Sequence, residues 1–327
     1  MLITKTPFRI SFCGGGSDLP AFYREEGGCV LSTSIDKYMY ISIHPYFDKN
    51  RISLKYSENE NVSDVNKIRH SIFHQALQDI PTSGVEIVST ADVPSGTGLG
   101  SSSSFTVGLL HSLYSYHGKF ASKARLAEEA CAIEIDKLQA PIGKQDQYAA
   151  AFGGLNFIEF HADDTVSVSP VITGKETRKR LQGNLVLFYT GFTHDANKIL
   201  SQQKANMKYS DKRRSLRQMC CMAREMKAAL ESNDLSSFGR LLDESWQLKR
   251  GLAAGITGSE IDDLYAKARR NGADGGKLLG AGGGGFLLFY CEKDMQAGLT
   301  EALGLRRFPF RFEHDGTSVI YVGDKYW

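Results

Sequence analysis

The chain has 327 residues, with 39 Lys and Arg against 37 Asp and Glu and 42% hydrophobic residues. This composition fits a packed globular protein of one large or two ordinary domains and excludes a disordered chain. The near-neutral charge argues against a nucleic-acid partner. No apolar run approaches the roughly 20 residues of a membrane-spanning helix, and the N-terminus lacks the apolar stretch of a signal peptide. The six cysteines show no CxxC spacing. We therefore expect a cytoplasmic protein with reduced thiols and no membrane partner.

The first half of the sequence predicts a sheet followed by helices. Residues 8–12 alternate between apolar and polar side chains, which indicates a strand. Further β-rich runs, which predict an antiparallel or mixed sheet, lie at 29–35, 38–47, 51–56 and 84–90. Helical patterns follow at 101–117, 123–138 and 144–151, before a strand at 155–160.

The second half has a different character. Residues 161–183 are polar and turn-like, and they predict a junction between domains at 1–165 and 166–327. Strands are then expected at 185–191 and 286–291, a long helical region at 196–231, helices at 234–249, 259–271 and 294–303, and a hairpin at 308–322 that turns at Asp315-Gly316. Because strands and helices do not alternate strictly, the fold class is predicted to be α+β.

Glycine is the compositional anomaly. The chain has 33 glycines, which is about a tenth of its residues where about 7% is usual. Many of them gather in three clusters. The middle cluster, Pro94-Ser95-Gly96-Thr97-Gly98-Leu99-Gly100, lies between a predicted strand and a predicted helix that opens with four serines. Alternate glycines let the backbone approach a ligand, and the helix N-terminus presents unpaired N–H groups, so this loop is a candidate phosphate site. A flexible turn with a serine cap is the alternative interpretation.

The middle cluster matches neither of the common nucleotide motifs. It lacks the lysine of a Walker A loop, and its G-x-G-x-G spacing is not that of a dinucleotide fold. The third cluster, Gly280 to Gly285, fits G-x-G-x-x-G formally, but the β-like run FLLFY follows it where a dinucleotide site needs a helix. It is predicted to bring backbone amides close to a ligand, or else to form a tight crossover without one.

The first cluster, Cys13 to Ser17, follows the strand at 8–12 and precedes Asp18. It places the Asp18 carboxylate on a loop near Arg9, where it could accept hydrogen bonds from sugar hydroxyls. An Asx turn or a helix cap is the alternative role for Asp18.

Together, FRIS with GGGSD, then PSGTGLGSSSS, then KLLGAGGGGF resemble the three signature motifs of the GHMP kinases in the same order. The resemblance extends from Pro7 to about Phe289. It implies a two-domain α+β fold, with a left-handed βαβ N-terminal domain like domain 2 of ribosomal protein S5 and an α+β C-terminal domain. It also implies an ATP-dependent kinase that uses Mg²⁺ and acts on a small sugar or sugar phosphate, as a monomer or a homodimer.

The resemblance assigns roles around the reacting phosphate. Asp146 matches the catalytic carboxylate, Arg9 the cation that supports it, and Glu134, with Ser102, the magnesium ligands. Phosphoryl transfer needs neutralised phosphates and a group that accepts or orients the proton of the attacking hydroxyl, which agrees with these assignments. The residues implied in ATP binding are Pro94, Gly96, Thr97, Gly98, Leu99, Gly100, Ser101, Ser102 and Ser103.

The resemblance is less specific about the residues that bind the acceptor substrate. The residues implied in substrate binding are Ser11, Gly15, Gly16, Asp18, Lys144, Gly282 and Gly283. The closer wording, such as GKQDQYAAAFGG, resembles the branch that phosphorylates the anomeric C1 hydroxyl of D-glycero-D-manno-heptose 7-phosphate. Lys249-Arg250 is a candidate for holding the second phosphate, with a solvated pair as the alternative.

Three other functions remain open at this point. One is a different sugar 1-kinase, of the fucokinase or galactokinase type. Another is a nucleotide-binding regulator that has lost catalysis, which the presence of Asp146 and Glu134 disfavours. A dinucleotide oxidoreductase is disfavoured by the strand expected after Gly285.

Overall fold

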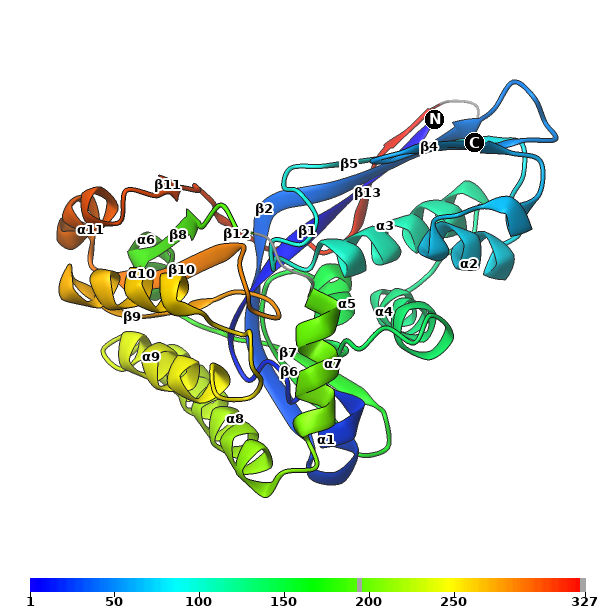
Figure 1. Ribbon diagram of the computed structural model, residues 1–327. Helices are drawn as coiled ribbons and strands as arrows, with labels where there is room; N and C mark the ends of the chain where they lie inside the picture. The colour runs from blue at the N-terminus through cyan, green and yellow to red at the C-terminus, as the bar shows by residue number, and fades with distance from the viewer. Residues whose placement is uncertain (193–195, 324–327) are drawn as a thin grey trace.

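Two β-sheets, one of nine strands and one of four, organise residues 1–192 and 196–323, which are the part of the chain described by this computed structural model (Figure 1). The large sheet is mixed, which is one of the two arrangements that the sequence leaves open, because β3 and β5 run parallel while its other pairs are antiparallel. Its strands are β1 (Leu2–Cys13), β2 (Gly28–Pro45), β3 (Ile52–Lys55), β4 (Asn59–Val62), β5 (Val85–Ala91), β6 (Leu155–Phe160), β7 (Val166–Pro170), β12 (Phe312–Glu313) and β13 (Ser318–Val322).

Strand β2 is the central strand of the large sheet. It pairs with β1 along most of its length, with β6 over its first residues and with β5 over its last. The two strands predicted at 29–35 and 38–47 are this one strand. Between them the register with β1 slips, because Phe8 faces Ile35 while Pro7 faces Tyr38. Pro7 has no N–H to donate to the ladder, so a bulge at this point costs little.

Helix α3 (Ser101–Tyr116) lies against β1 and β2, and hydrogen bonds tie it there. The Ser104 hydroxyl donates to the Pro7 carbonyl at 2.9 Å, and the Thr4 and Ser112 hydroxyls lie 2.7 Å apart. Helix α4 (Lys123–Cys131) continues into a wider π-type segment, Ala132–Lys137, so the predicted helix at 123–138 is confirmed with a change of pitch. The other helices of this half are α1 (Pro20–Glu26), α2 (Ser71–Asp79) and α5 (Gln145–Phe152), and α5 packs against α4.

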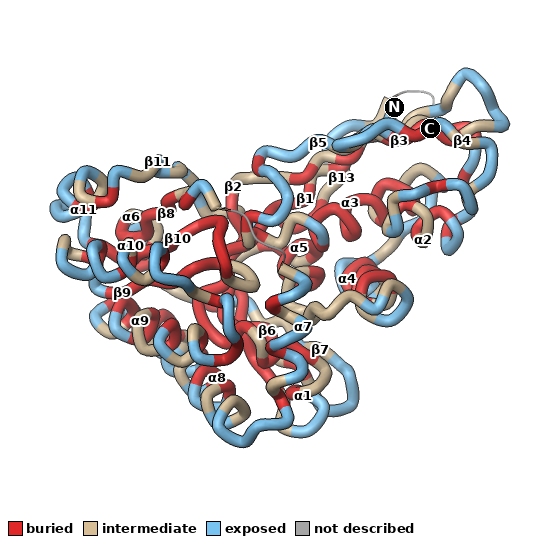
Figure 2. The backbone as a smooth tube through the Cα atoms, viewed as in Figure 1, coloured by how far each residue is buried: buried red, intermediate tan, exposed pale blue. Residues whose placement is uncertain are grey.

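The small sheet is antiparallel and has the order β11 (Arg306–Arg307), β8 (Leu185–Tyr189), β10 (Phe286–Cys291) and β9 (Ala273–Leu278). All six residues of β10 are buried, and this strand forms one of the continuous buried stretches in Figure 2. The helices of this half are α6 (Lys175–Asn184), α7 (Ala196–Asn206), α8 (Ser210–Glu231), α9 (Phe238–Lys249), α10 (Ser259–Arg270) and α11 (Gln296–Leu303), and short 3-10 turns lie at Val65–Lys67 and Lys293–Met295.

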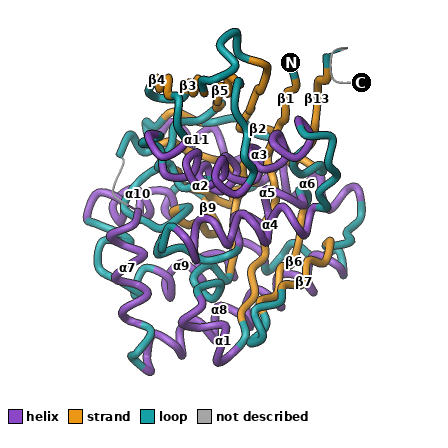
Figure 3. The backbone as a smooth tube through the Cα atoms, turned by 90° about the vertical axis from the view of Figure 1, so that its right-hand side faces the viewer, coloured by secondary structure: helices purple, strands orange, loops and turns teal. Residues whose placement is uncertain are grey.

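The end of the chain corrects one prediction. The hairpin expected at 308–322 is wrong, because β12 pairs with β2 and β13 pairs with β1 rather than with each other. Strand β12 adds to β2 at Ser34 and Ile35, and β13 occupies the outer edge of β1. Each short strand therefore gains ladder hydrogen bonds to a long strand, which two short strands could not give each other. Figures 1 and 3 both show β1 and β13 side by side.

Other elements were not expected from the sequence. The polar stretch at 161–183 contains β7 and α6, and the long helical region is two helices separated at Met207 to Tyr209. Strand β9 was not predicted because its sequence, ADGGKL, contains two glycines, which are unfavourable in strands. It forms a strand because its backbone pairs with the buried strand β10. The division at residues 165 and 166 stays a prediction, and β7, β12 and β13 from beyond it belong to the large sheet.

The two halves of the protein share a hydrophobic contact. The Phe12 ring, on β1, meets the Phe238 ring, on α9, edge to face with centroids 5.3 Å apart. We predict that Phe12→Ala lowers the free energy of unfolding by about 3–5 kcal/mol, because it leaves a cavity at a fully buried contact. Phe47 is 99% exposed, so Phe47→Ala should change that free energy by no more than about 0.5 kcal/mol. Denaturant unfolding measures both, and equal effects would contradict this account of the core.

Candidate functional site

Two cavities meet where β1, the loop before α3, the start of α5 and the loop after β9 converge. The larger, about 530 Å³, is lined by Gly96, Gly98, Gly100, Ser101 to Ser103 and Glu134. The smaller, about 70 Å³, is lined by Gly15, Gly16, Asp18, Gln145, Gln203 and Lys249. Both cavities are lined by Arg9 and Asp146, together with Ile142, Leu200, Gly280 and Ala281. Arg9 and Asp146 therefore stand in the wall between the two spaces.

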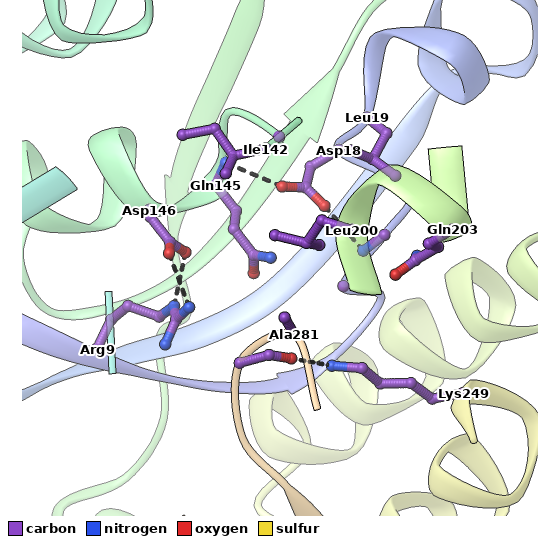
Figure 4. Close-up of a pocket in the computed structure, with 14 residues that line it drawn as sticks. Arg9, Asp18, Leu19, Ile142, Gln145, Asp146, Leu200, Gln203, Lys249 and Ala281 are labelled. Atoms are coloured by element: carbon purple, nitrogen blue, oxygen red, sulfur yellow. Dashed lines mark hydrogen bonds and ion pairs between the residues drawn. The ribbon is translucent and has the colours of Figure 1, made fainter. Parts of the chain in front are cut away.

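Arg9 and Asp146 form a two-pronged ion pair. Arg9 Nε donates to Asp146 Oδ1 at 2.7 Å, and Nη2 donates to Oδ2 at 2.8 Å (Figure 4). Such parallel charge-assisted bonds fix both the distance and the plane of the two groups. The Arg9 side chain is buried while the Asp146 side chain is 24% exposed. The carboxylate is thus held rigidly yet remains open to the cavities.

The same arginine anchors the middle glycine loop. Its Nη1 donates to the Gly98 carbonyl at 2.6 Å, and its backbone N–H donates to the Leu99 carbonyl at 3.0 Å. Gly98 has a φ of +85°, and a Cβ there would lie 2.6 Å from the Leu279 carbonyl oxygen. The second and third glycine clusters therefore touch backbone to backbone, which explains why glycine is needed at the contact.

Helix α3 starts at the larger cavity. Gly100, in the left-handed conformation, precedes Ser101, and Ser101 to Ser103 line the cavity. The first amides of a helix have no partner within the helix, and its dipole makes this end positive. The arrangement predicted from the sequence, a glycine loop leading into a helix N-terminus at a cavity, is present in the structure.

Glu134 lies beneath that helix start. It accepts a hydrogen bond from the Ser102 hydroxyl at 2.6 Å and one from Gln147 Nε2 at 2.8 Å. The side chain is only 2% exposed, and this burial raises the pKa of the Glu134 carboxyl, while the hydrogen bonds from Ser102 and Gln147 oppose the rise. The π-type segment carries Glu134, and such segments are frequent at functional sites.

Asp18 braces the smaller cavity. Its Oδ1 accepts a hydrogen bond from the Gly16 N–H at 2.8 Å, and its Oδ2 accepts one from the Gln145 N–H at 3.2 Å. Burial raises the pKa of the Asp18 carboxyl. The predicted contact with sugar hydroxyls stays a prediction, since the residue lines the cavity and each oxygen retains a second lone pair.

Lys144 is directed away from the site. Its Nζ donates to the Asp164 carbonyl at 2.9 Å and lies 3.3 Å from Asp164 Oδ1, and Lys144 lines neither cavity. Two residues correspond to about 200° of rotation on a helix, so a residue two positions before Asp146 faces the other way. The arrangement does not support the predicted substrate contact of Lys144.

Some of the other residues predicted to bind ATP or substrate line a cavity, and some do not. Gly282 lines the larger cavity. Gly283 lines neither cavity, and its N–H donates a hydrogen bond to the Ile256 carbonyl. Thr97 and Leu99 are buried inside the loop, and the Thr97 hydroxyl donates to the Pro94 carbonyl at 2.9 Å. These three residues shape the backbone rather than line the cavities.

Pro94 lines a third cavity, of about 560 Å³. This cavity shares Gly96, Ser101 and Ser102 with the 530 Å³ cavity described above, which keeps the name of the larger cavity of the first two. Ser11 has a buried hydroxyl with no hydrogen-bond partner among the described residues, 3.7 Å from where a Cβ on Gly15 would lie.

Sequence reasoning missed several polar side chains of the site. Gln145 and Gln147 flank Asp146, and a pair of amides around a candidate carboxylate is a signal that could have found them. Gln203 lines the smaller cavity from α7 and has no signal in the sequence. The candidate pair Lys249-Arg250 is split, because Lys249 lines the smaller cavity and Arg250 pairs with Asp262 at 2.6 Å.

Comparison with known proteins gives this fold and site a family. The family model described as "GHMP kinases N terminal domain" matches residues 66–154, and that described as "GHMP kinases C terminal" matches residues 226–303. The chain belongs to the GHMP kinases, which are ATP-dependent phosphotransferases, and it has their two-domain fold of mixed α and β structure.

The sequence identities to individual proteins of known name are low, at 24–29%. The chain is 29% identical over 315 residues to the D-glycero-alpha-D-manno-heptose 7-phosphate kinase of Campylobacter jejuni, with 92% of each chain covered. It is 24% identical to the L-fucokinase/L-fucose-1-P guanylyltransferase of Bacteroides fragilis, over 90% of this chain and 35% of that one. A solved D-glycero-D-manno-heptose 1-phosphate kinase from Bacteroides thetaiotaomicron has a TM-score of 0.81 at 24% identity, covering 99% of this chain and 100% of its own, which shows a shared fold.

The chain contains no membrane-spanning candidate in the described ranges, since none of their helices is both long and apolar enough.

The buried Glu134 carboxylate should cost stability. Its pKa is raised in the folded protein, so the folded state holds the proton more tightly than the unfolded chain, and stability falls as pH rises above the ordinary carboxyl pKa of 4.5. We predict that Glu134→Gln melts at a higher temperature than the unsubstituted protein at pH 7, and that the difference disappears near pH 4.5. Thermal unfolding without nucleotide or metal measures this. A glutamine variant that is less stable at pH 7 would contradict the stated cost.

Proposed function

We propose that this GHMP kinase transfers the γ-phosphoryl group of ATP to the anomeric C1 hydroxyl of D-glycero-D-manno-heptose 7-phosphate, giving the 1,7-bisphosphate, in the biosynthesis of activated heptose. The observation that carries the proposal is the position of the Arg9–Asp146 pair in the wall shared by two cavities. A donor in the larger cavity and an acceptor that reaches into the smaller one would meet at this pair. Six free cysteines are consistent with action in the reducing cytoplasm.

The donor phosphates belong in the larger cavity. The glycine loop and the first residues of α3 line it, and backbone amides at a helix N-terminus bind phosphate without a lysine. The nucleoside would extend into the third cavity, which shares Gly96, Ser101 and Ser102 and is lined further on by Tyr56, His70 and Phe105. These aromatic side chains offer ring faces against which a base can stack.

Ser102 and Glu134 would hold Mg²⁺. Both supply oxygen ligands, which this hard cation prefers, and their side chains already lie 2.6 Å apart. Within the described ranges no group of three or more His, Cys, Asp and Glu side chains can hold a metal. This donor set fits Mg²⁺ in kinases, which commonly takes one or two protein ligands and completes its shell with substrate phosphates and water. When bound, the ion would neutralise phosphate charge.

The acceptor hydroxyl would be activated at Asp146. The carboxylate accepts or orients the hydroxyl proton while the oxygen attacks the γ-phosphorus and ADP leaves. Arg9 holds both carboxylate oxygens in a fixed plane, which leaves one lone pair on each for the incoming hydroxyl. The Gly98 carbonyl on the same guanidinium keeps the phosphate loop in register with the base.

The particular acceptor is supported by the heptose 7-phosphate kinase relative, which aligns along 92% of both chains. A second candidate is another sugar 1-kinase of the fucokinase or galactokinase type, which the match to the fucokinase enzyme favours. The two candidates share the proposed chemistry and differ in the acceptor alone.

Replacing the proposed base tests the chemistry. We predict that Asp146→Asn lowers kcat by about 10²- to 10⁴-fold, because the amide cannot take up the proton, and leaves the affinity for a non-hydrolysable ATP analogue nearly unchanged. Steady-state rates and calorimetric titration measure the two quantities. Asp136 is exposed and lines neither cavity, so Asp136→Asn is a matched control that should keep full activity. An Asp146→Asn enzyme with near-normal turnover would overturn the assignment.

An acceptor panel tests the substrate. We expect D-glycero-D-manno-heptose 7-phosphate to give the highest kcat/KM, and ³¹P NMR of the product to show a new phosphate on C1. L-Fucose, D-galactose and D-mannose complete the panel under the same conditions. Strong activity on an unphosphorylated hexose with none on the heptose phosphate would replace the proposed acceptor with the second candidate.

A further inference from the structure

Lys249 is a buried lysine that pairs with no carboxylate of the described residues. It lies at the end of α9, lines the smaller cavity and is only 6% exposed. Its Nζ donates one hydrogen bond, to the Gly280 carbonyl at 2.6 Å (Figure 4). Within residues 1–192 and 196–323 no carboxylate oxygen lies close enough to Nζ to form an ion pair. An ammonium has three N–H donors, so two of them are left for a ligand.

The carboxylates near Lys249 already have other partners. Asp146 is paired with Arg9, and Asp18 is held by two backbone N–H groups. A second buried lysine, Lys277, donates to the Phe12 carbonyl at 2.9 Å, and burial lowers the pKa of Lys277 well below its ordinary value. Neither carboxylate is therefore free to pair with Lys249. Burial, together with repulsion from Arg9, lowers the pKa of Lys249 to about 8. Buried charge of one sign is costly unless a counter-charge arrives.

Other buried polar groups in or beside the cavity have no hydrogen-bond partner among the described residues. The Gln203 Nε2 atom, on α7, is buried and unpaired, and its amide packs directly against Gly16. Ser11 Oγ, beside Gly15, is likewise unpaired. The unpaired Gln145 Oε1 is an acceptor that suits a sugar hydroxyl. Buried polar groups are generally hydrogen-bonded, so these atoms are suited to contact a ligand or water.

We propose that Lys249, with Gln203, forms a subsite for the phosphoryl group that the acceptor already carries, and that this subsite sets the preference for a phosphorylated over a neutral sugar. The inference rests on the proposed function and deepens it. The cavity, at about 70 Å³, has room for a few water molecules, so it suits a phosphoryl group rather than a whole sugar. The sugar ring would extend from it toward the wall that Arg9 and Asp146 form.

The test compares two acceptors that differ only in this phosphate. With D-glycero-D-manno-heptose 7-phosphate, Lys249→Met should lower kcat/KM about 10- to 100-fold, which is the range expected for charge-assisted hydrogen bonds. With unphosphorylated D-glycero-D-manno-heptose, kcat/KM should change by less than about twofold. Arg240 is an exposed cation on the same helix, so Arg240→Met is the matched control and should change neither value. Gln203→Leu should weaken the phosphorylated acceptor selectively as well, and by less.

Two results would overturn the proposal. Equal losses for both acceptors in Lys249→Met would assign the lysine to the transferring phosphate or to the Gly280 loop, and unchanged values for both would leave it no role in binding. Thermal unfolding checks that the variant is folded, which we expect because it removes a buried charge.

Calorimetric titration of heptose 7-phosphate without ATP separates the subsite from the proposed function. Binding by the unsubstituted enzyme that Lys249→Met weakens about 10- to 100-fold supports the subsite, even if no phosphate is transferred and the proposed function fails. Conversely, an unsubstituted enzyme that uses both acceptors equally well would keep a kinase function and eliminate the subsite.

Discussion

The ion pair between Arg9 and Asp146 is the constraint on which the rest of the site depends. It joins the middle of β1 to the first turn of α5, and through the Gly98 and Leu99 carbonyls it also fixes the loop that opens α3. That loop in turn touches the backbone of the third glycine cluster. One guanidinium therefore sets the relative position of the proposed base, the proposed phosphate loop and the loop from the small sheet. Because each contact is a hydrogen bond to a charged group or a backbone contact, little of this geometry depends on flexible side chains.

The site is assembled from groups that oppose stability. Glu134, Asp18, Lys249 and Lys277 are all buried, and burial shifts the pKa of each toward its neutral form. Aliphatic side chains of similar size would pack at these places at less cost. The large hydrophobic core around β1, β2, α3 and α9, much of which is drawn as buried in Figure 2, offsets this loss of stability. Residues that lower stability are common at functional sites, and these buried ionisable residues lie at or near the two adjoining cavities.

The sequence predicted the parts of this architecture that are encoded locally. Alternation identified β1, the glycine spacing identified the loop before α3, and the order of the three motifs indicated the family and the pairing of Arg9 with Asp146. The failures involve long-range geometry. Where β12 and β13 pair depends on which strand edges remain open, and the outward turn of Lys144 depends on where α5 begins. Gln203 and the unpaired state of Lys249 become visible only when α7 and α9 are placed against the first glycine cluster.

The most direct test of the account is a double-mutant cycle on the central pair. The kcat/KM for ATP at a saturating acceptor is measured for the unsubstituted enzyme, Arg9→Met, Asp146→Asn and the double variant. If the two side chains act as one unit, the double variant should be no more than about threefold worse than the worse single variant, because residues of a catalytic unit are strongly non-additive. Losses that multiply, with each substitution costing as much in the presence of the other as alone, would show independent roles and contradict the central claim.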